Sequence, residues 1–351
     1  MTSLTAARPS FTATANSRAP GWVSGWLMFM VLLVVAMIVV GGATRLTNSG
    51  LSITEWAPIR GALPPLSEAQ WLSEFEKYKQ IPEFSAEHPD MDLAGFRFIY
   101  FWEWAHRQLG RVIGLVWALP FLWLAIKRRL PRGRGLAYTA VLLLIGLQGA
   151  IGWWMVYSGL QEGMVSVSQY RLATHLGMAF VILGLLLWLY LDFRNRERNE
   201  EGEKLVLPAI LLGTTWLQII AGAFVAGTGS GKTYNEWPLM DGRFVPDGYL
   251  IQDPAIRNIF ENPAAIQFNH RTLAYILLAL FAVAAWRCRR ISSLKTPLLL
   301  LGGLLLWQVA LGIWTLLAAA PLNLALLHQF SSVLVFLTAV WMTYRGRNLR
   351  Y

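Results

Sequence analysis

The sequence predicts an all-α, polytopic membrane protein whose eight transmembrane helices form two tandem four-helix bundles. Three observations support this prediction: the composition, the length of the apolar runs and an internal repeat. Of the 351 residues, 55% are hydrophobic and only 14% are charged, which excludes an ordinary soluble enzyme. Eight apolar runs can cross a bilayer, which takes about 20 helical residues. They lie at residues 22–43, 97–126, 135–158, 171–191, 205–227, 265–286, 296–318 and 324–344.

The internal repeat divides the chain into two halves of four spans. Gly50, Glu55-Trp56, Gly61 and Pro65 match Gly231, Glu236-Trp237, Gly242 and Pro246 at one constant offset. Further along, His106-Arg107 matches His270-Arg271, Gln148-Gly-Ala-Ile-Gly152 matches Gln308-Val-Ala-Leu-Gly312, and His175 matches His328. Because four is an even number of spans, the two halves have the same orientation. We therefore expect a pseudo-two-fold axis along the membrane normal.

Positive charge gathers after the second, fourth, sixth and eighth spans. The residues are Lys127, Arg128, Arg129, Arg132 and Arg134; Arg194, Arg196, Arg198 and Lys204; Arg287, Arg289, Arg290 and Lys295; and Arg345, Arg347 and Arg350. Basic loops mark the cytoplasmic side of a membrane protein, so we expect both termini in the cytoplasm. The net charge of +10 is thus a topology signal, and no nucleic-acid partner is expected. A bacterial inner membrane is the predicted location, with the mitochondrial inner membrane as the alternative.

These signals divide the chain into five predicted parts. They are an N-terminal cytoplasmic tail (1–21), an N-terminal bundle (22–192) with an outer loop at 44–96, a cytoplasmic linker (193–204), a C-terminal bundle (205–345) with an outer loop at 228–264, and a C-terminal tail (346–351). No cleavable apolar core precedes the first span, so we interpret residues 1–21 as a tail and not as a transit peptide.

The first outer loop contains an amphipathic stretch at residues 67–80. It begins with Ser67-Glu68, a typical helix start, and has apolar residues at helical spacing. These residues are Trp71, Leu72, Phe75 and Tyr78. The pattern predicts a helix that lies on the outer membrane surface as a lid.

Four histidines occupy equivalent depths in the spans. His175, His270 and His328 each lie 17 residues before the cytoplasmic end of their span, about 26 Å along a helix at about 1.5 Å per residue. His106 lies 21 residues before Lys127, about 31 Å on the same rise. All four are therefore expected in the outer leaflet, two per half and able to face one another.

Two facing imidazoles in each half suit the two axial positions of a haem iron. An intramembrane histidine can also be a simple interhelical hydrogen-bond donor, but four at one depth in a repeat favour ligation. A non-haem metal is disfavoured because no carboxylate cluster accompanies both pairs. Arg107 and Arg271 directly follow two of the histidines, and guanidinium groups suit haem propionates. Small residues near these spans, among them Gly152 and Gly312, permit close approach of a macrocycle or a helix.

Glu103 makes the two halves chemically unequal. It lies three residues before His106, on the same helix face, whereas Gln267 holds this position before His270. A carboxylate here can accept a proton or steer water. The alternative is a hydrogen bond that orients a ligand.

One stretch imitates a nucleotide-binding loop. Residues Ala226-Gly-Thr-Gly-Ser-Gly-Lys-Thr233 resemble a phosphate-binding loop, but alanine replaces its first glycine and a membrane span precedes it in place of a strand. We interpret these glycines as an outer turn.

With these residues in view, the chain resembles the haem A synthase family, of the proteobacterial and mitochondrial type. The resemblance covers nearly the whole chain, from Gly41-Gly-Ala-Thr-Arg-Leu-Thr-Asn-Ser-Gly through Glu103-Trp-Ala-His-Arg107 to His328-Gln329. It implies an N-terminal substrate site for haem O, with His106 and His175 as ligands and Glu103 as the catalytic carboxylate. It further implies a cofactor haem b in the C-terminal half, on His270 and His328.

The activity that the resemblance implies is oxidation of a haem O methyl group to a formyl group by successive hydroxylations, which gives haem A. Expected partners are haem O synthase, an unidentified electron acceptor, the lipid bilayer and a second copy of the chain. Two rival hypotheses are a dihaem b-type electron-transfer protein and a transporter. Electron carriers often place one haem near each membrane face, and a transporter needs polar groups near the midplane; here the four histidines lie on one side.

Overall fold

The computed structural model describes residues 19–57, 59–195 and 205–347. Within them, eight helices are long and apolar enough to cross a membrane, which confirms the eight predicted spans. These are α1 (Trp22–Leu46), α4 (Leu93–Ile126), α5 (Gly135–Gly159), α6 (Gln169–Arg194), α7 (Val206–Thr228), α9 (Pro263–Cys288), α10 (Ser292–Leu317) and α11 (Leu322–Gly346). The described part of the chain has no β-strand, only one isolated bridge between Met240 and Arg243. The chain is therefore an all-α protein.

Helix ends extend a few residues beyond the predicted spans because capping groups lie outside the apolar runs. The α4 helix begins at Leu93, not at 97, since the Asp92 side chain accepts a hydrogen bond from the Gly95 backbone N–H at 2.8 Å. In the second half, α9 begins at Pro263, where the Asn262 side chain accepts from the Ala264 N–H at 3.0 Å.

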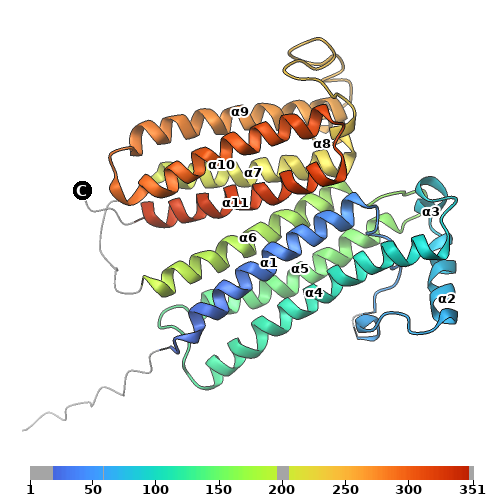
Figure 1. Ribbon diagram of the computed structural model, residues 1–351, viewed down its shortest axis with the longest axis horizontal. Coiled ribbons are helices and arrows are strands. Elements are labelled where there is room, and N and C mark those ends of the chain that lie inside the picture. The colour runs from blue at the N-terminus through green and yellow to red at the C-terminus, as the bar shows by residue number, and fades with distance from the viewer. Residues whose placement is uncertain (1–18, 58, 196–204, 348–351) are drawn as a thin grey trace, which may run out of the picture.

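The helices pack in two groups (Figure 1). In the first group, α1 and α5 each contact both α4 and α6. In the second group, α7 and α10 each contact both α9 and α11. The groups meet where α6 packs on α7 and α11, and α1 on α11. Phe180 and Phe336 make an edge-to-face contact at 5.1 Å across this junction. The pseudo-two-fold axis and the exact domain boundaries stay predictions.

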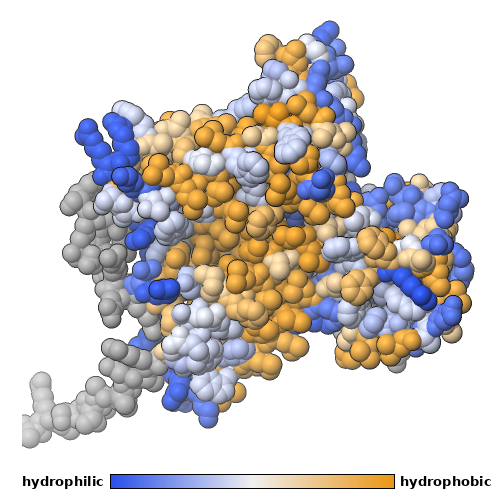
Figure 2. All heavy atoms as spheres, viewed as in Figure 1, coloured by the Kyte–Doolittle hydropathy of each residue, from blue (hydrophilic) through white to orange (hydrophobic). Residues whose placement is uncertain are grey.

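Each end of the bundle is polar and its middle is apolar. Figure 2 shows hydrophobic residues over the helices and hydrophilic ones gathered at both ends. At the end where α1 begins and α11 ends, Asp192 accepts hydrogen bonds from Arg134 at 2.7 and 2.9 Å and from Arg347 at 3.0 Å. One carboxylate thereby joins the α4–α5 connection, α6 and the end of α11. The predicted tail residues 1–18 and 348–351, and linker residues 196–204 with Arg196, Arg198 and Lys204, lie outside the described residues.

The predicted amphipathic helix of the first outer loop is confirmed as α2 (Glu68–Lys79). Ser67 accepts from the Gln70 backbone N–H, and the Gln70 side chain accepts from the Ser67 N–H, which together make a capping box. The apolar face packs on the first turns of α4, where the Phe75 and Phe96 rings stack at 4.9 Å. The short helix α3 (Pro82–Glu87) follows. Its function as a lid stays a prediction.

The second outer loop begins directly after α7. Gly229, with φ of 69°, ends that helix, and the short 3-10 helix η2 (Ser230–Lys232) follows. The stretch that imitates a phosphate-binding loop is thus the end of a membrane helix and a turn. The loop continues through η3 (Ala255–Arg257) and α8 (Asn258–Glu261) to α9.

Candidate haem sites

The four helix histidines lie on α4, α6, α9 and α11, each near the end that carries the outer loops. The His106 and His175 rings face one another with 6.5 Å between ring centroids and 58° between ring planes. Two metal–nitrogen bonds of about 2 Å, plus the two ring radii, come to about this separation. The sequence placed these two residues on one level, and the structure brings their rings together.

A glycine on a neighbouring helix lies against each of the four imidazoles. A Cβ atom added to that glycine would come close to the Cε1 atom of the ring. The pairs are Gly41 with His106 at 2.9 Å, Gly152 with His175 at 2.9 Å, Gly222 with His270 at 3.2 Å, and Gly312 with His328 at 2.9 Å. A larger residue would force each ring to shift, by less at Gly222 than at the other three, so these glycines set the position of the imidazoles. Sequence reasoning assigned close approach to Gly152 and Gly312 and did not assign it to the other two.

Three of the histidines also have a glutamine partner, which sequence reasoning missed. The amide nitrogen of each glutamine lies close to the ring Nδ1 and donates to the backbone carbonyl of the same histidine. The pairs are Gln148 with His175 (3.2 and 3.0 Å), Gln218 with His270 (3.1 and 3.0 Å) and Gln308 with His328 (3.3 and 3.1 Å). In each case the glutamine lies four residues before the glycine of the same helix, so the signal was Gln-x-x-x-Gly at 148–152, 218–222 and 308–312.

Glu103 is 3% exposed and is fully engaged by donors. Its Oε1 accepts from Arg107 Nε at 3.1 Å and Nη2 at 2.5 Å, and its Oε2 accepts from the Ser52 hydroxyl and the Ile53 N–H, both at 2.7 Å. An ionised carboxylate can be buried when charge-assisted hydrogen bonds satisfy it in this way. The structure thus joins Glu103 to a stretch about 50 residues earlier in the chain, which sequence reasoning did not link to it.

The equivalent position in the second half is neutral. Gln267 is also 3% exposed; its amide nitrogen donates to the Ser230 carbonyl at 2.7 Å, and its oxygen accepts from Arg271 Nη2 at 2.8 Å. Arg271 further donates to the carbonyls of Leu239 and Tyr234. Both halves pair an arginine with an acceptor four residues earlier, but Arg107 donates through Nε and Nη2, whereas Arg271 donates through Nη2 and its Nε has no partner among the described residues. At this position only the first half has a group that can take up a proton.

Arg107 and Arg271 hold the outer loops as well as the acceptor beside them. Arg107 donates to the carbonyl oxygens of Ile53 at 2.8 Å and Glu55 at 3.2 Å. The side chain is 20% exposed, so part of the guanidinium stays accessible. The pairing of these arginines with haem propionates stays a prediction.

The donor set fits a haem better than a bare metal ion. No group of three or more histidine, cysteine, aspartate or glutamate residues that could hold a metal occurs in the part of the chain that the structure describes. Two facing imidazoles would leave a bare ion with few ligands, whereas a porphyrin supplies four nitrogens of its own and needs only axial ligands. His106 and His175 meet that need, with a glycine surface beside each ring.

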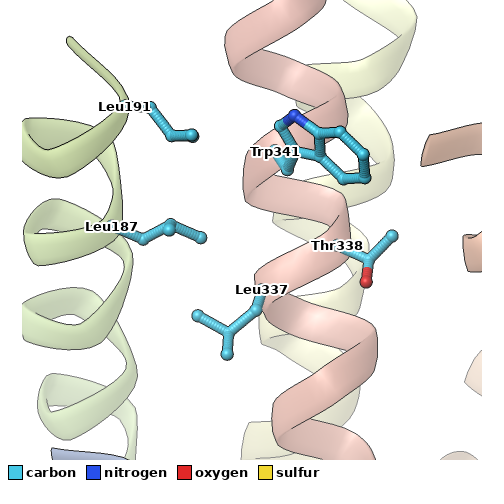
Figure 3. Close-up of a pocket in the computed structure, with 5 residues that line it drawn as sticks. All are labelled: Leu187, Leu191, Leu337, Thr338 and Trp341. Carbon is cyan, nitrogen blue, oxygen red and sulfur yellow. The ribbon is translucent and has the colours of Figure 1, made fainter. Parts of the chain in front are cut away.

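A separate cavity of about 230 Å³ lies between α6 and α11 at the other end of these helices (Figure 3). It is lined by Leu187, Leu191, Leu337, Thr338 and Trp341. Leu187 follows His175 by twelve residues on α6, about 18 Å at about 1.5 Å per residue. This apolar cavity is therefore distinct from the histidine sites.

Comparison with known proteins agrees with this geometry. A family described as "Cytochrome oxidase assembly protein" matches residues 24–340. A protein of Ruegeria pomeroyi is 50% identical over 347 residues, which cover 94% of this chain and 90% of that protein. A protein of Maricaulis maris is 48% identical over 342 residues, 96% of this chain and 99% of that protein. Both are named heme A synthase. The chain therefore belongs to the haem A synthase family of cytochrome oxidase assembly proteins.

Proposed function

We propose that this protein is a haem A synthase, which oxidises one methyl group of haem O to the formyl group of haem A for terminal oxidases. The names of its relatives support the activity, and the family description supports a role in oxidase assembly. The observation that carries the proposal is a pair of imidazoles 6.5 Å apart with a buried carboxylate three residues before one of them.

Substrate and cofactor occupy different halves in this proposal. His106 and His175 hold haem O, and His270 and His328 hold haem b. When bound, haem b supplies one-electron redox chemistry, which suits the removal of electrons from the substrate. Arg107 and Arg271 bind propionates at the outer ends of the sites. The matched glycines beside all four rings support two sites of one design.

Glu103 manages protons at the substrate site. Oxidation of a methyl group to a formyl group with water as the oxygen source releases protons along with the electrons that pass to the acceptor, and Glu103 is the ionisable member of the Glu103/Gln267 pair. Because a hydroxyl both donates and accepts, Ser52 can pass a proton to the Glu103 carboxylate at 2.7 Å while Arg107 keeps that carboxylate in place. The same step is impossible at Gln267, whose amide does not ionise.

The membrane orientation follows the charge distribution. Arg134, Arg194, Arg287 and Arg345 lie at the ends of the spans opposite the histidines, which supports cytoplasmic termini in a bacterial inner membrane. The histidines and the outer loops then face the outer leaflet. Haem O synthase is the proposed source of the substrate, and an electron acceptor and a second copy of the chain are further proposed partners.

The test is pigment extraction and mass analysis of the purified protein, expressed with and without a haem O synthase. The expected result is that haem O and haem A appear beside haem b only when a haem O synthase is co-expressed. Haem b alone under both conditions, with a bis-histidine spectrum, would favour a dihaem electron carrier. Protein without any haem would overturn both haem sites.

A further inference from the structure

The fourth histidine, His106, lacks the glutamine that the other three have. On α1, the residue four positions before Gly41 is Met37, where α5, α7 and α10 have Gln148, Gln218 and Gln308. The Met37 methyl group reaches α4, since it lies 3.4 Å from a Cβ built at Gly110, one turn after His106. A thioether therefore stands at the helix position that an amide occupies beside the other rings.

The consequence is visible at the ring itself. The Nδ1 atom of His106 is buried and has no hydrogen-bond partner among the described residues. Beside each of the other three rings, a glutamine amide nitrogen lies 3.1–3.3 Å from Nδ1 and 3.3–3.4 Å from Nε2, and it donates to the backbone carbonyl of the same histidine. An amide carries both a donor and an acceptor, whereas a thioether is only a weak acceptor. Packing against Gly41 and its own helix is what holds His106.

A side chain that bonds to a ligating histidine from outside the metal site holds the orientation of that ligand. Removal of such a partner typically lowers metal affinity by about 10–100-fold. By this measure His106 is the weakest of the four candidate ligands, and it lies on the helix that carries Glu103. The other ligand of its pair, His175, keeps its glutamine, and both ligands of the second half keep theirs.

We infer that Met37 makes His106 the exchangeable ligand of the N-terminal haem, so that this haem can enter and leave while the C-terminal haem stays. The inference rests on the proposed function and deepens it. A substrate must leave as product in every turnover, whereas a cofactor must not. Met37 is therefore a positioning residue: it supplies no amide to hold the ring and the backbone carbonyl of His106, as the glutamines do for the other three histidines.

The test exchanges the two side chains. Methionine and glutamine are unbranched and of similar size, so Met37→Gln and Gln218→Met change hydrogen bonding with little change in volume. Met37→Leu is the matched control, because it keeps an apolar side chain without an amide. Each variant is purified from cells that also contain haem O synthase, and excess apomyoglobin then serves as the haem acceptor.

The readout is the rate at which each pigment leaves, with haem O and haem A distinguished from haem b by extraction. We expect Met37→Gln to slow the loss of haem O and haem A by about 10-fold or more, with haem b loss unchanged and a stronger low-spin bis-histidine spectrum. Met37→Leu should match the wild type. Gln218→Met should speed the loss of haem b by about 10-fold and leave the N-terminal pigment unaffected. Unchanged haem b occupancy in Met37→Gln shows that the variant is folded.

Two results would overturn the inference. In the first, Met37→Gln releases haem O at the wild-type rate while Gln218→Met loses haem b faster. The glutamine amide would then help to retain haem b, but residue 37 would not control the release of haem O. If neither exchange changes its rate, the glutamines do not hold the ligands at all. Failure of the proposed function is a separate result, because the wild type would then carry no haem O or haem A before any variant is compared.

Discussion

The two halves of the protein surround their histidines in the same way and differ there at two positions, one buried and one half-buried. Each half places two histidines against glycines and joins an arginine to an acceptor four residues earlier on the same helix. The first half has Glu103 and Met37 where the second has Gln267 and Gln218. One difference adds an ionisable group, and the other removes an amide from beside a histidine. In the function we propose, these two side chains divide a duplicated site into a reactive half and a retentive half.

The largest expected effect comes from a change that makes the first half resemble the second. Glu103→Gln should lower formation of haem A at least about 100-fold, since general acid–base groups contribute about 10²–10⁴-fold. Haem O should still bind, because Gln267 shows that an amide can accept from the adjacent arginine. The measurement is the ratio of haem A to haem O in pigment extracts.

Glu76→Gln removes a carboxylate that is 63% exposed on α2; it is the control for this variant and should leave haem A formation close to that of the wild type. Haem A produced by Glu103→Gln at near wild-type rate would show that Glu103 is not the catalytic base. In that case its role would be to hold Arg107 and the first outer loop.

Loss of one histidine should lower the content of only the haem that is bound in the same half. His270→Ala and His328→Ala should each strongly lower haem b content, because a haem iron would keep only one protein ligand in that half. Haem O bound on co-expression should remain. Difference spectra and extracted pigment per protein provide the measurement. Full haem b occupancy in either variant would contradict the assignment of the cofactor to the C-terminal half.

Substitution of the glycines beside the histidines tests the independence of the two halves with a smaller change. Gly152→Ala and Gly312→Ala each place a methyl group 2.9 Å from a histidine Cε1 atom, and overpacking of this kind costs about 1–3 kcal/mol. We expect weaker haem binding only in the half that is changed, measured by titration of haem into the apoprotein. Gly114→Ala, where a Cβ would meet nothing within 4 Å, is the control and should bind normally. Equal weakening in both halves would point to a general folding defect.

The outer loops differ in the kind of group that holds them. The first loop buries Glu83, whose Oε2 accepts from the Tyr78 hydroxyl at 3.2 Å, and Tyr78 also contacts His88 Nδ1 at 2.8 Å. The second loop buries Asn258 instead, whose Oδ1 accepts from the backbone N–H groups of residues 251 and 252. The first loop therefore depends on groups that titrate, and the second on a neutral amide.

Burial raises the pKa of Glu83 from 4.5 to about 8; the hydrogen bond from Tyr78 opposes this shift, and nearby Glu103 and Glu87 add to it. Burial lowers the pKa of His88 below its ordinary value of 6.5. The folded first loop thus binds the Glu83 proton more tightly than the unfolded loop does, so the contribution of Glu83 to stability is lost as pH rises towards about 8. His88 changes the stability of the loop with pH only below about pH 6.5. Between pH 6.5 and about 8, the pH dependence of stability is therefore that of Glu83.

Hydrogen exchange at α2 measures this smallest effect. Protection of its amides should fall as pH rises from about 6.5 to about 8, after correction for the intrinsic exchange rate, and Glu83→Gln should remove that fall. Amides of the second outer loop serve as the internal control and should show no such trend. An equal fall in both loops would show that the pH dependence arises elsewhere.

The sequence by itself determined the features that follow from solvent and local chemistry. Eight apolar runs specify eight spans because a bilayer permits few other structures for them. Ser67 predicted the start of α2, which a local capping box of Ser67 and Gln70 forms. The four histidines and the Glu103/Gln267 difference were visible because the repeat aligns the halves residue by residue.

Only the tertiary structure decided which side chains meet across helices. The contacts of Gln218 with His270 and of Ser52 with Glu103 join positions about 50 residues apart, and they depend on helix rotation and register, which hydropathy does not encode. The same holds for Gly41 against His106 and for the missing amide at Met37. Each of these is a contact between two helices, so its meaning appeared only when both helices were in place.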